Sequence, residues 1–468
     1  MLLRTVFIDR RCFVMKIVET ILNQMGGLTQ PKRNFILALF STILIVCGNV
    51  NFTNLSRYSN KCEKTYRRHF KKPFPFVEFN SRLIKEAIPE GHKKILAIDC
   101  SFIPKSGKKT YGKDYFFNGV SGRAEKGLEL SVISVIDVDS NIGYSLSVKQ
   151  TPSQTEINKK STTKILVESS PTNYSQNNSS KKNKSNKSNK SKGKKKKNGN
   201  KSKQKALKHK NNEVELSRID IYLESLKEIN NNLPPDINYL VADGYYSKEK
   251  FVTGVSKLNL NQIGKLRHDA NMRYLYTGSQ NKLGAKRKYD GKVKLTELQK
   301  LTFVKELAPK IYLYTAVVNH VTLKRNIRIA YIIDRRDTQT TKTALLFSTD
   351  TELDAEEIYY YYKARFQIEF IFRDAKQFTG LTDCQARDRF KLDFHFNASL
   401  TALNLAKFEQ LRAHNNVSPF VFSMASSKRL AFIEHLLETF ISKLDLDPIA
   451  IKNHPEYEVL LSYGSISA

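Results

Sequence analysis

The chain has 468 residues, 40% of them apolar, which is enough for two or three domains with buried cores. Lysine and arginine number 78 against 45 acidic residues, and the formal charge of +33 favours nucleic acid over an anionic membrane surface as the partner. The five cysteines are scattered without C-x-x-C spacing, which argues against a disulfide framework or a zinc site and favours a reducing cytoplasm. The apolar run at 35–46 is too short to span a bilayer, so no membrane partner is expected.

The first 90 residues are predicted to be helical and to bind DNA. Two short helices around a turn at 59–61 fit a helix-turn-helix, and the second helix would carry Lys64, Arg67 and Arg68. Prolines at 73 and 75 end that second helix. The alternative interpretation is an ordinary basic helical hairpin.

The periodicity changes after residue 93 and predicts an α/β arrangement. Strands are expected at 95–103, in two runs joined by a polar turn within 126–151, and at 237–246, with an amphipathic helix at 214–229. Asp99 lies inside the first apolar strand, and Asp243 ends the last one.

A low-complexity tract at 156–212 consists almost wholly of lysine, asparagine and serine, and it cannot bury enough apolar surface to fold. The segment 181–210 alone holds fifteen lysines and no acid, which is nearly half of the net charge. The tract is either an electrostatic tether for DNA or a neutral insertion in a loop. Its repetitive KSNKSNKSK favours the neutral insertion.

The segment YKARFQIEFIFRDAK, at 362–376, is predicted to form one continuous helix. At about 100° per residue, its acid and three of its cations share an arc of roughly 80°, and the apolar residues form a separate stripe. The residues on that arc are Arg365, Glu369, Arg373 and Lys376. The alternative is a solvated face with i,i+4 ion pairs such as Arg365–Glu369.

Asp99, Asp243 and Glu369 together suggest a metal site. A carboxylate within an apolar strand is costly unless it is paired or binds a metal. Hard oxygen ligands without a histidine or cysteine cluster favour Mg²⁺ or Mn²⁺. Three carboxylates can hold two such ions, an arrangement that serves phosphoryl transfer.

The spacing Tyr362-x2-Arg365-x3-Glu369-x6-Lys376 resembles the Tyr-Arg-Glu-Lys signature of bacterial insertion-sequence transposases, in the group called insertion sequence family four. Further segments are similar to this group: ILAIDCSFIPKSGKKTYG around Asp99, YLVADGYYSKEKFV around Asp243, and KLRHDANMRYLY at 265–276. The resemblance covers roughly residues 90–155 and 214–410.

This resemblance implies a DDE transposase with a ribonuclease-H-like core, in which Asp99, Asp243 and Glu369 form the metal-binding triad. Tyr362, Arg365 and Lys376 would contact the DNA backbone at the transposon end. Arg373 lies on the same predicted helix face but outside the signature, so its DNA contact is a separate hypothesis. Relatives stack an aromatic residue, often tryptophan, on a flipped base. This chain has no tryptophan, so a tyrosine or phenylalanine would have to replace it.

The predicted fold class is α/β, with the following parts: an N-terminal helical DNA-binding region (1–90), a ribonuclease-H-like catalytic core (91–261 and 344–420), the disordered Lys/Asn/Ser-rich insertion (156–212), a β-rich insertion (262–343) and a C-terminal helical region (421–468).

The expected function is Mg²⁺- or Mn²⁺-dependent cleavage at transposon ends, with strand transfer into target DNA. The partners would be double-stranded terminal inverted repeats and target DNA, bound by a homodimer in the cytoplasm, at the nucleoid. One alternative is a ribonuclease-H-like nuclease that cuts without joining. Another is an inactive or domesticated DNA-binding protein.

Overall fold

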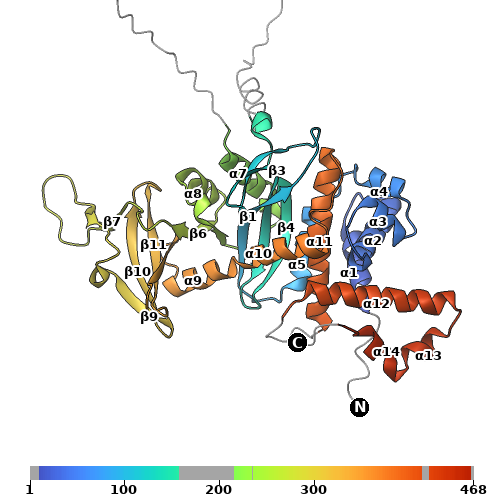
Figure 1. The fold of residues 1–468 in the computed structure, drawn as a ribbon. Coiled ribbons are helices and arrows are strands. Elements are labelled where there is room, and N and C mark those ends of the chain that lie inside the picture. Colours follow the sequence, from blue (N-terminus) through green and yellow to red (C-terminus); the bar gives the residue numbers. More distant parts are fainter. Residues whose placement is uncertain (1–9, 158–215, 235, 414–420, 465–468) are drawn as a thin grey trace, which may run out of the picture. The chain divides into compact units, whose positions relative to one another are not determined.

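The computed structural model describes residues 10–157, 216–234, 236–413 and 421–464 (Figure 1). The chain divides into two units, Met1–Ser153 with Arg218–Ala468, and Gln154–Ser217. Only 154–157 and 216–217 of the second unit are described, so the predicted low-complexity insertion lies almost wholly outside the described residues. Within the described ranges, no helix is both long and apolar enough to cross a bilayer.

Five strands in the order β4-β3-β1-β5-β6 form the core of the sheet. Their bounds are β1 Lys94–Pro104, β3 Arg123–Asp137, β4 Ile142–Gln150, β5 Tyr239–Ala242 and β6 Asn261–Leu266. β1 and β4 run antiparallel to β3, whereas β5 is parallel to both β1 and β6. This mixed order fits the expected ribonuclease-H-like core. The apolar runs form central strands because consecutive side chains such as Ile95 and Leu96, which point to opposite faces, are both fully buried.

The sheet continues from β6 into the segment that was predicted to be rich in strands. β12 pairs antiparallel with β6, and the order then runs β12-β11-β10-β7-β8, with β9 also on β10. Their bounds are β7 Met272–Leu275, β8 Tyr289–Lys292, β9 Thr302–Ala308, β10 Ile311–His320, β11 Arg325–Asp334 and β12 Lys342–Ser348. These strands surround an apolar cluster of their own, which includes Val318, Ile327 and Phe347.

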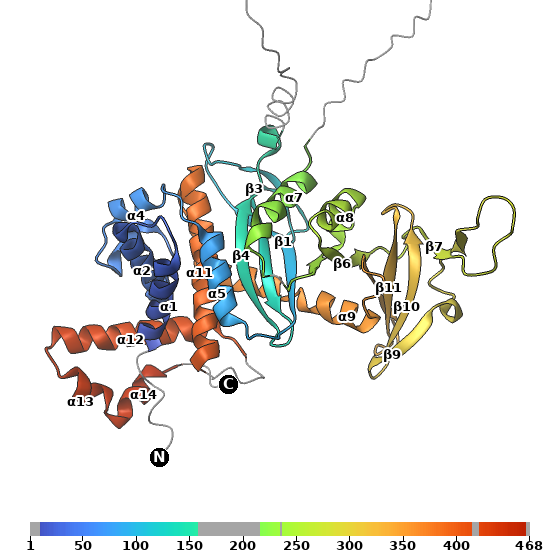
Figure 2. The same cartoon turned by 180° about the vertical axis from the view of Figure 1, so that it is seen from behind.

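Helices contact the core strands on both sides (Figures 1 and 2). α5 Phe76–Ala87, α10 Gln367–Phe378 and α11 Arg389–Ala413 contact β4, and α8 Glu249–Ser256 contacts β6 and α7 Arg218–Ile229. The remaining N-terminal helices are α1 Arg10–Gln24, α2 Gln30–Ile45, α3 Phe52–Arg57 and α4 Glu63–His69. The C-terminal helices are α12 Met424–Lys443, α13 Pro448–Lys452 and α14 Pro455–Leu461. The rings of Phe35 and Phe70 pack on Phe394 of α11, which ties the N-terminal helices to the core.

The prediction of one continuous helix over 362–376 is wrong. α9 Ala355–Ala364 ends before Arg365, and α10 begins at Gln367. Around this break the backbone bonds become i→i−3, as in Phe366 N–H to Lys363 and Glu369 N–H to Phe366, which is a tighter 3₁₀-type turn. The break falls where the chain passes from α9, packed on β11 and β12, to α10, packed on β1 and β4.

Side chains of α11 form hydrogen bonds with the backbone of the outer strand β4. In the described part of the chain β4 pairs with β3 alone, which leaves one row of backbone groups without a strand partner. The fully buried amide of Asn404 accepts from Ser145 N–H at 2.9 Å and donates to the same residue's carbonyl at 2.7 Å. Lys407 donates to the Gly143 carbonyl at 2.6 Å. These bonds fix α11 against the sheet.

We predict that Asn404→Leu destabilises the fold with little change in side-chain volume. Each backbone group of Ser145 that is left buried without a partner should cost about 1–3 kcal/mol. Urea denaturation should therefore show a clearly lower free energy of unfolding. Gln377→Leu, which replaces an exposed amide on α10, is the matched control and should change stability little. Equal stability of the two variants would contradict the role given to Asn404.

Candidate active site

The sheet topology places Asp99 beside Asp243. Ile98 of β1 lies opposite Ala242 of β5 in parallel register, and each aspartate directly follows one of these residues. Asp243 caps the short turn after β5, where its carboxylate accepts from Tyr245 N–H at 2.9 Å. Two carboxylates far apart in the sequence are therefore neighbours, one inside β1 and the other directly after the end of the adjacent parallel strand β5.

Arg365 connects the third predicted acid to this pair. Its Nη1 donates to Asp99 Oδ2 at 2.9 Å, and its Nη2 donates to Glu369 Oε1 at 2.8 Å. The Arg365 side chain is only 12% exposed, and Asp99 is 20% exposed. One guanidinium therefore lies between carboxylates from β1 and α10.

The environment of Asp99 is unfavourable for a lone carboxylate. Burial is the main cause that raises the pKa of Asp99 to about 6, while Arg365 opposes the shift and Asp243 adds to it. The site thus holds carboxylate oxygens whose charge calls for a cation nearby. The Arg365 guanidinium supplies one, but its buried Nε has no hydrogen-bond partner among the described residues.

The remaining residues of the predicted helix face do not surround Glu369. Tyr362 is half-buried near Arg365, whose Cζ is 5.7 Å from its ring centroid, and burial raises its pKa. Arg373 pairs with Asp374 at 2.9 Å. Lys376 lines a separate hollow of about 480 Å³, and burial lowers its pKa. Of the three cations on the predicted arc, Arg365 alone contacts Glu369 among the described residues.

The predicted DNA-binding cations at the N-terminus all lie on α4. Lys64 and Arg68 are exposed. Arg67 donates to Glu63 at 2.6 Å, and its guanidinium stacks over the Phe52 ring of α3 at 5.1 Å. α3 and α4 thus form the expected pair of short helices, and Arg67 stabilises the pair.

An open hollow of about 990 Å³ begins beside Asp243, at Gly244. Its lining includes Lys265, Arg267 and His268, which end β6 and follow it. Sequence reasoning noted this segment in the resemblance but did not choose it as a site. The order of the strands could have indicated this site. β6 follows β5 along the chain, and parallel strands end at the same edge of a sheet, so residues after β6 are expected near Asp243.

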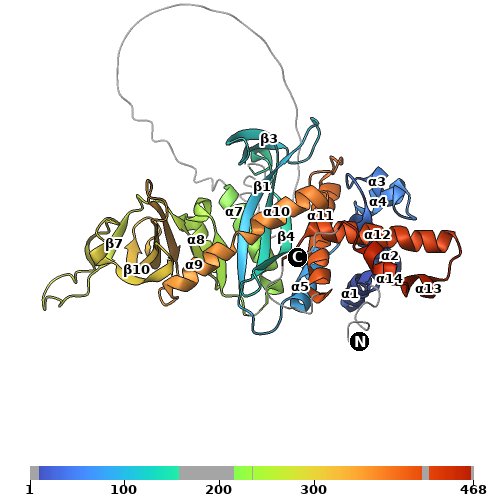
Figure 3. The same cartoon turned by 60° about the horizontal axis from the view of Figure 1, so that its bottom comes forward.

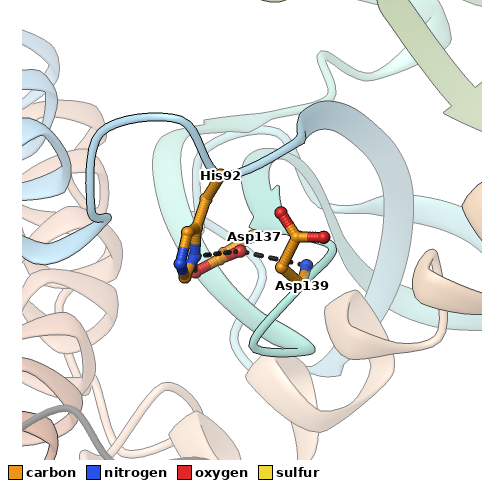
Figure 4. A group of neighbouring side chains, drawn as sticks. All are labelled: His92, Asp137 and Asp139. Carbon is orange, nitrogen blue, oxygen red and sulfur yellow. Dashed lines mark hydrogen bonds and ion pairs between the residues drawn. The ribbon is translucent and has the colours of Figure 1, made fainter.

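A His/Asp/Asp group lies at the other end of β1 (Figure 4). Among the described residues, His92, Asp137 and Asp139 alone form a set of three possible ligands within 4.8 Å of one another. Asp137 already accepts from His92 Nδ1 at 2.9 Å and from the Asp139 and Ser140 N–H groups. The group could hold a metal, but its hydrogen bonds also have a structural explanation, because they stabilise the turn between β3 and β4. Asp99, Asp243 and Glu369 do not reach this spacing, and Arg365 lies between two of them.

A ribonuclease-H-like sheet with one aspartate inside a central strand and another directly after the adjacent parallel strand is the arrangement of a phosphodiester-cleaving enzyme. The family model described as DDE superfamily endonuclease matches residues 71–309, just over half of the chain, and the chain belongs to this family. The prediction of a DDE enzyme is thereby confirmed. The match includes Asp99 and Asp243 but ends before Glu369.

No curated protein matches the chain. Among solved structures, the cryo-EM structure of the piggyBac transposase synaptic complex with hairpin DNA is similar at 8% identity and a TM-score of 0.42. The alignment covers 99% of this chain and 86% of that chain.

We predict that Arg365→Gln makes the stability of the protein depend on divalent metal. Without the guanidinium, Asp99 and Glu369 repel, and unfolding in EDTA should become easier by about 2–3 kcal/mol, below the range for a fully buried pair. Mn²⁺ should then raise the melting temperature of the variant more than that of the unaltered chain. Arg373→Gln is the control, since Arg373 contacts Asp374 instead. Identical Mn²⁺ responses in all three proteins would show that Arg365 does not balance these acids.

Proposed function

We propose that this DDE enzyme is a transposase related to insertion sequence family four, with Asp99, Asp243 and Glu369 as its catalytic residues. The observation that carries the proposal is the Arg365 guanidinium held between Asp99 and Glu369, with Asp243 next in register to Asp99. Acids from β1, β5 and α10 that are brought together in this way could share a metal ion. The Tyr-Arg-Glu-Lys spacing supports the family assignment.

The oxygen donors of the site fit Mg²⁺ or Mn²⁺, because a cation already lies between two of them and no histidine or cysteine is among them. Asp99, Asp243 and Glu369 would hold one or two ions. Such ions lower the barrier by neutralising charge that builds on the phosphate oxygens. Arg365 would then be released from the carboxylates and become available to a DNA phosphate.

The proposed reaction begins with hydrolysis of a phosphodiester at the end of the element. Water adds to phosphorus, the P–O3′ bond breaks, and a 3′-hydroxyl is freed. As the resemblance implies, this hydroxyl attacks a phosphorus of the opposite strand to form a hairpin, and the P–O3′ bond to the flanking DNA breaks. Water then opens the hairpin at the same phosphodiester, and the freed 3′-hydroxyl attacks a target phosphorus, where the target P–O3′ bond breaks. Tyr362, Arg365, Arg373 and Lys376 would position the backbone. The basic hollow after β6 would receive DNA beside Asp243.

We predict that Glu369→Gln abolishes metal-dependent end cleavage while end binding is retained, because the change removes a charge but almost no volume. The measurement is gel analysis of labelled DNA that carries the sequences flanking the gene, in Mg²⁺ and in EDTA. Full cleavage by this variant would overturn the assignment of Glu369. Strand transfer of pre-cut ends into a plasmid separates a transposase from a nuclease that only cuts.

We propose further that the N-terminal helices recognise the terminal inverted repeats and that two copies of the chain act on two ends. Lys64 and Arg68 are placed for phosphate contacts because they are exposed on the second helix of the pair. The proposed location, the cytoplasm at the nucleoid, follows from this substrate.

We predict that Lys64→Glu combined with Arg68→Glu weakens DNA binding and lowers its salt dependence. If each cation contacts one phosphate, the slope of log K against log salt should fall by about 2 in magnitude. Fluorescence anisotropy between 50 and 200 mM salt measures the slope. The control, Lys85→Glu with Lys257→Glu, makes the same charge change on exposed parts of α5 and the end of α8. Equal slopes for the two variants would reject α4 as a DNA contact.

A further inference from the structure

The strand β2, Asp114–Asn118, carries two exposed aromatic side chains. Tyr115 is 60% exposed and Phe117 is 64% exposed, whereas Phe116 between them is 1% exposed. This alternation is that of a strand with one face packed and the other in water. The chain therefore presents two rings side by side to solvent, on a strand whose third ring is in the core.

The exposed rings lie on the same face of the sheet as Asp99. Asp99 is opposite Val132 of β3, and Tyr115 and Phe117 are opposite Lys126 and Ala124 of the same strand. Directly opposed residues share a face, and positions an even number apart along a strand share a face too. Lys126 and Ala124 are six and eight residues from Val132, so all these side chains point to the catalytic side.

The opposite face of this hairpin is anchored to the core. The Arg218 guanidinium of α7 stacks over the Phe116 ring at 4.7 Å and donates to the Tyr115 carbonyl at 3.2 Å. The preceding loop is held where Gln150 donates to the Tyr111 carbonyl at 2.9 Å. Figure 3 shows β3 extending past β1 toward this hairpin. The two rings are thus held in place by the core.

The surroundings of the rings are basic. Residues 105–126 contain six lysines and arginines against two acids. One of those acids, Glu125, is engaged by Asn118 at 2.8 Å and by Arg123 at 3.1 Å. The Nζ of Lys126 lies 5.7 Å from the Tyr115 ring centroid. Flat apolar rings beside cations suit an anionic partner with flat faces, which is a nucleic acid with unpaired bases.

We propose that Tyr115 and Phe117 stack on unpaired bases of the DNA strand that leaves the active site, with Lys126 on its phosphates. This inference rests on the proposed function. At 3.3–3.4 Å per residue, the rings lie roughly 20–27 Å along β3 from the position opposite Asp99. At about 3.4 Å per nucleotide of one strand, that is roughly six to eight nucleotides from the scissile phosphate.

The test compares two DNA probes by fluorescence anisotropy, a blunt 20-base-pair duplex and the same duplex with a dT8 single-stranded arm. The unaltered chain should bind the armed duplex more tightly. Tyr115→Ala with Phe117→Ala should lose this preference, by about tenfold for each ring removed, which is within the range of base–aromatic stacking. Tyr115→Phe with Phe117→Tyr, which keeps both rings, should retain it. Phe303→Ala removes a ring that is 53% exposed on β9 and is the matched control.

Four results would overturn the inference. An unchanged preference in the double alanine variant would show that the rings do not meet the arm. A fall in self-association without any loss of DNA affinity, measured by sedimentation, would show that a second copy of the chain covers them. Failure of the unaltered chain to bind either DNA would reject the proposed function together with this inference, whereas cleavage of duplex ends with no arm preference would reject this inference alone.

Discussion

The rest of the site depends on one ion-pair arrangement, the Arg365 guanidinium between Asp99 and Glu369. Carboxylates that converge in a partly buried site repel one another, and burial disfavours their charge. The guanidinium offsets the negative charge of two of these carboxylates, because its two Nη atoms each donate to a different one. Asp99 can therefore remain in an apolar strand, and α10 can bring Glu369 toward the sheet.

Two backbone features make this ion pair possible. The break between α9 and α10 falls at Arg365, so the side chain leaves a tight turn and reaches across to β1. Gly143 of β4 lets the start of α10 approach closely, since a Cβ there would lie 3.0 Å from the Gln367 Cβ and 3.2 Å from Ile371. A larger residue at 143 would push away the helix that carries Glu369. The position of the third acid is thus set from β4 as well as from its own helix.

Local patterns in the sequence were sufficient to predict the helices and strands. They were not sufficient to predict which strands pair or where one helix ends and the next begins. The apolar run around Asp99 could be recognised as a buried strand because both of its faces are apolar. That Asp99 lies next to Asp243 follows only from the pairing of Ile98 with Ala242, a contact between distant segments. Helical periodicity did not reveal the break at Arg365, because the apolar stripe continues on both sides of it. Likewise, Asn404 has meaning only once β4 is known to be an outer strand facing α11.

The composition gives the number of cations but does not show which of them are available to DNA. Arg373 is engaged by Asp374, Arg67 by Glu63, and Arg365 by two acids of the site. Burial lowers the pKa of Lys376, so its charge is costly where it lies. The charge of an enzyme of this kind therefore falls into two classes, cations that balance internal carboxylates and cations that face solvent. A DNA phosphate can bind a cation of the first class only by displacing its carboxylates, and a divalent ion can bind those carboxylates only by displacing the cation. Metal binding and DNA binding would therefore be coupled at Arg365.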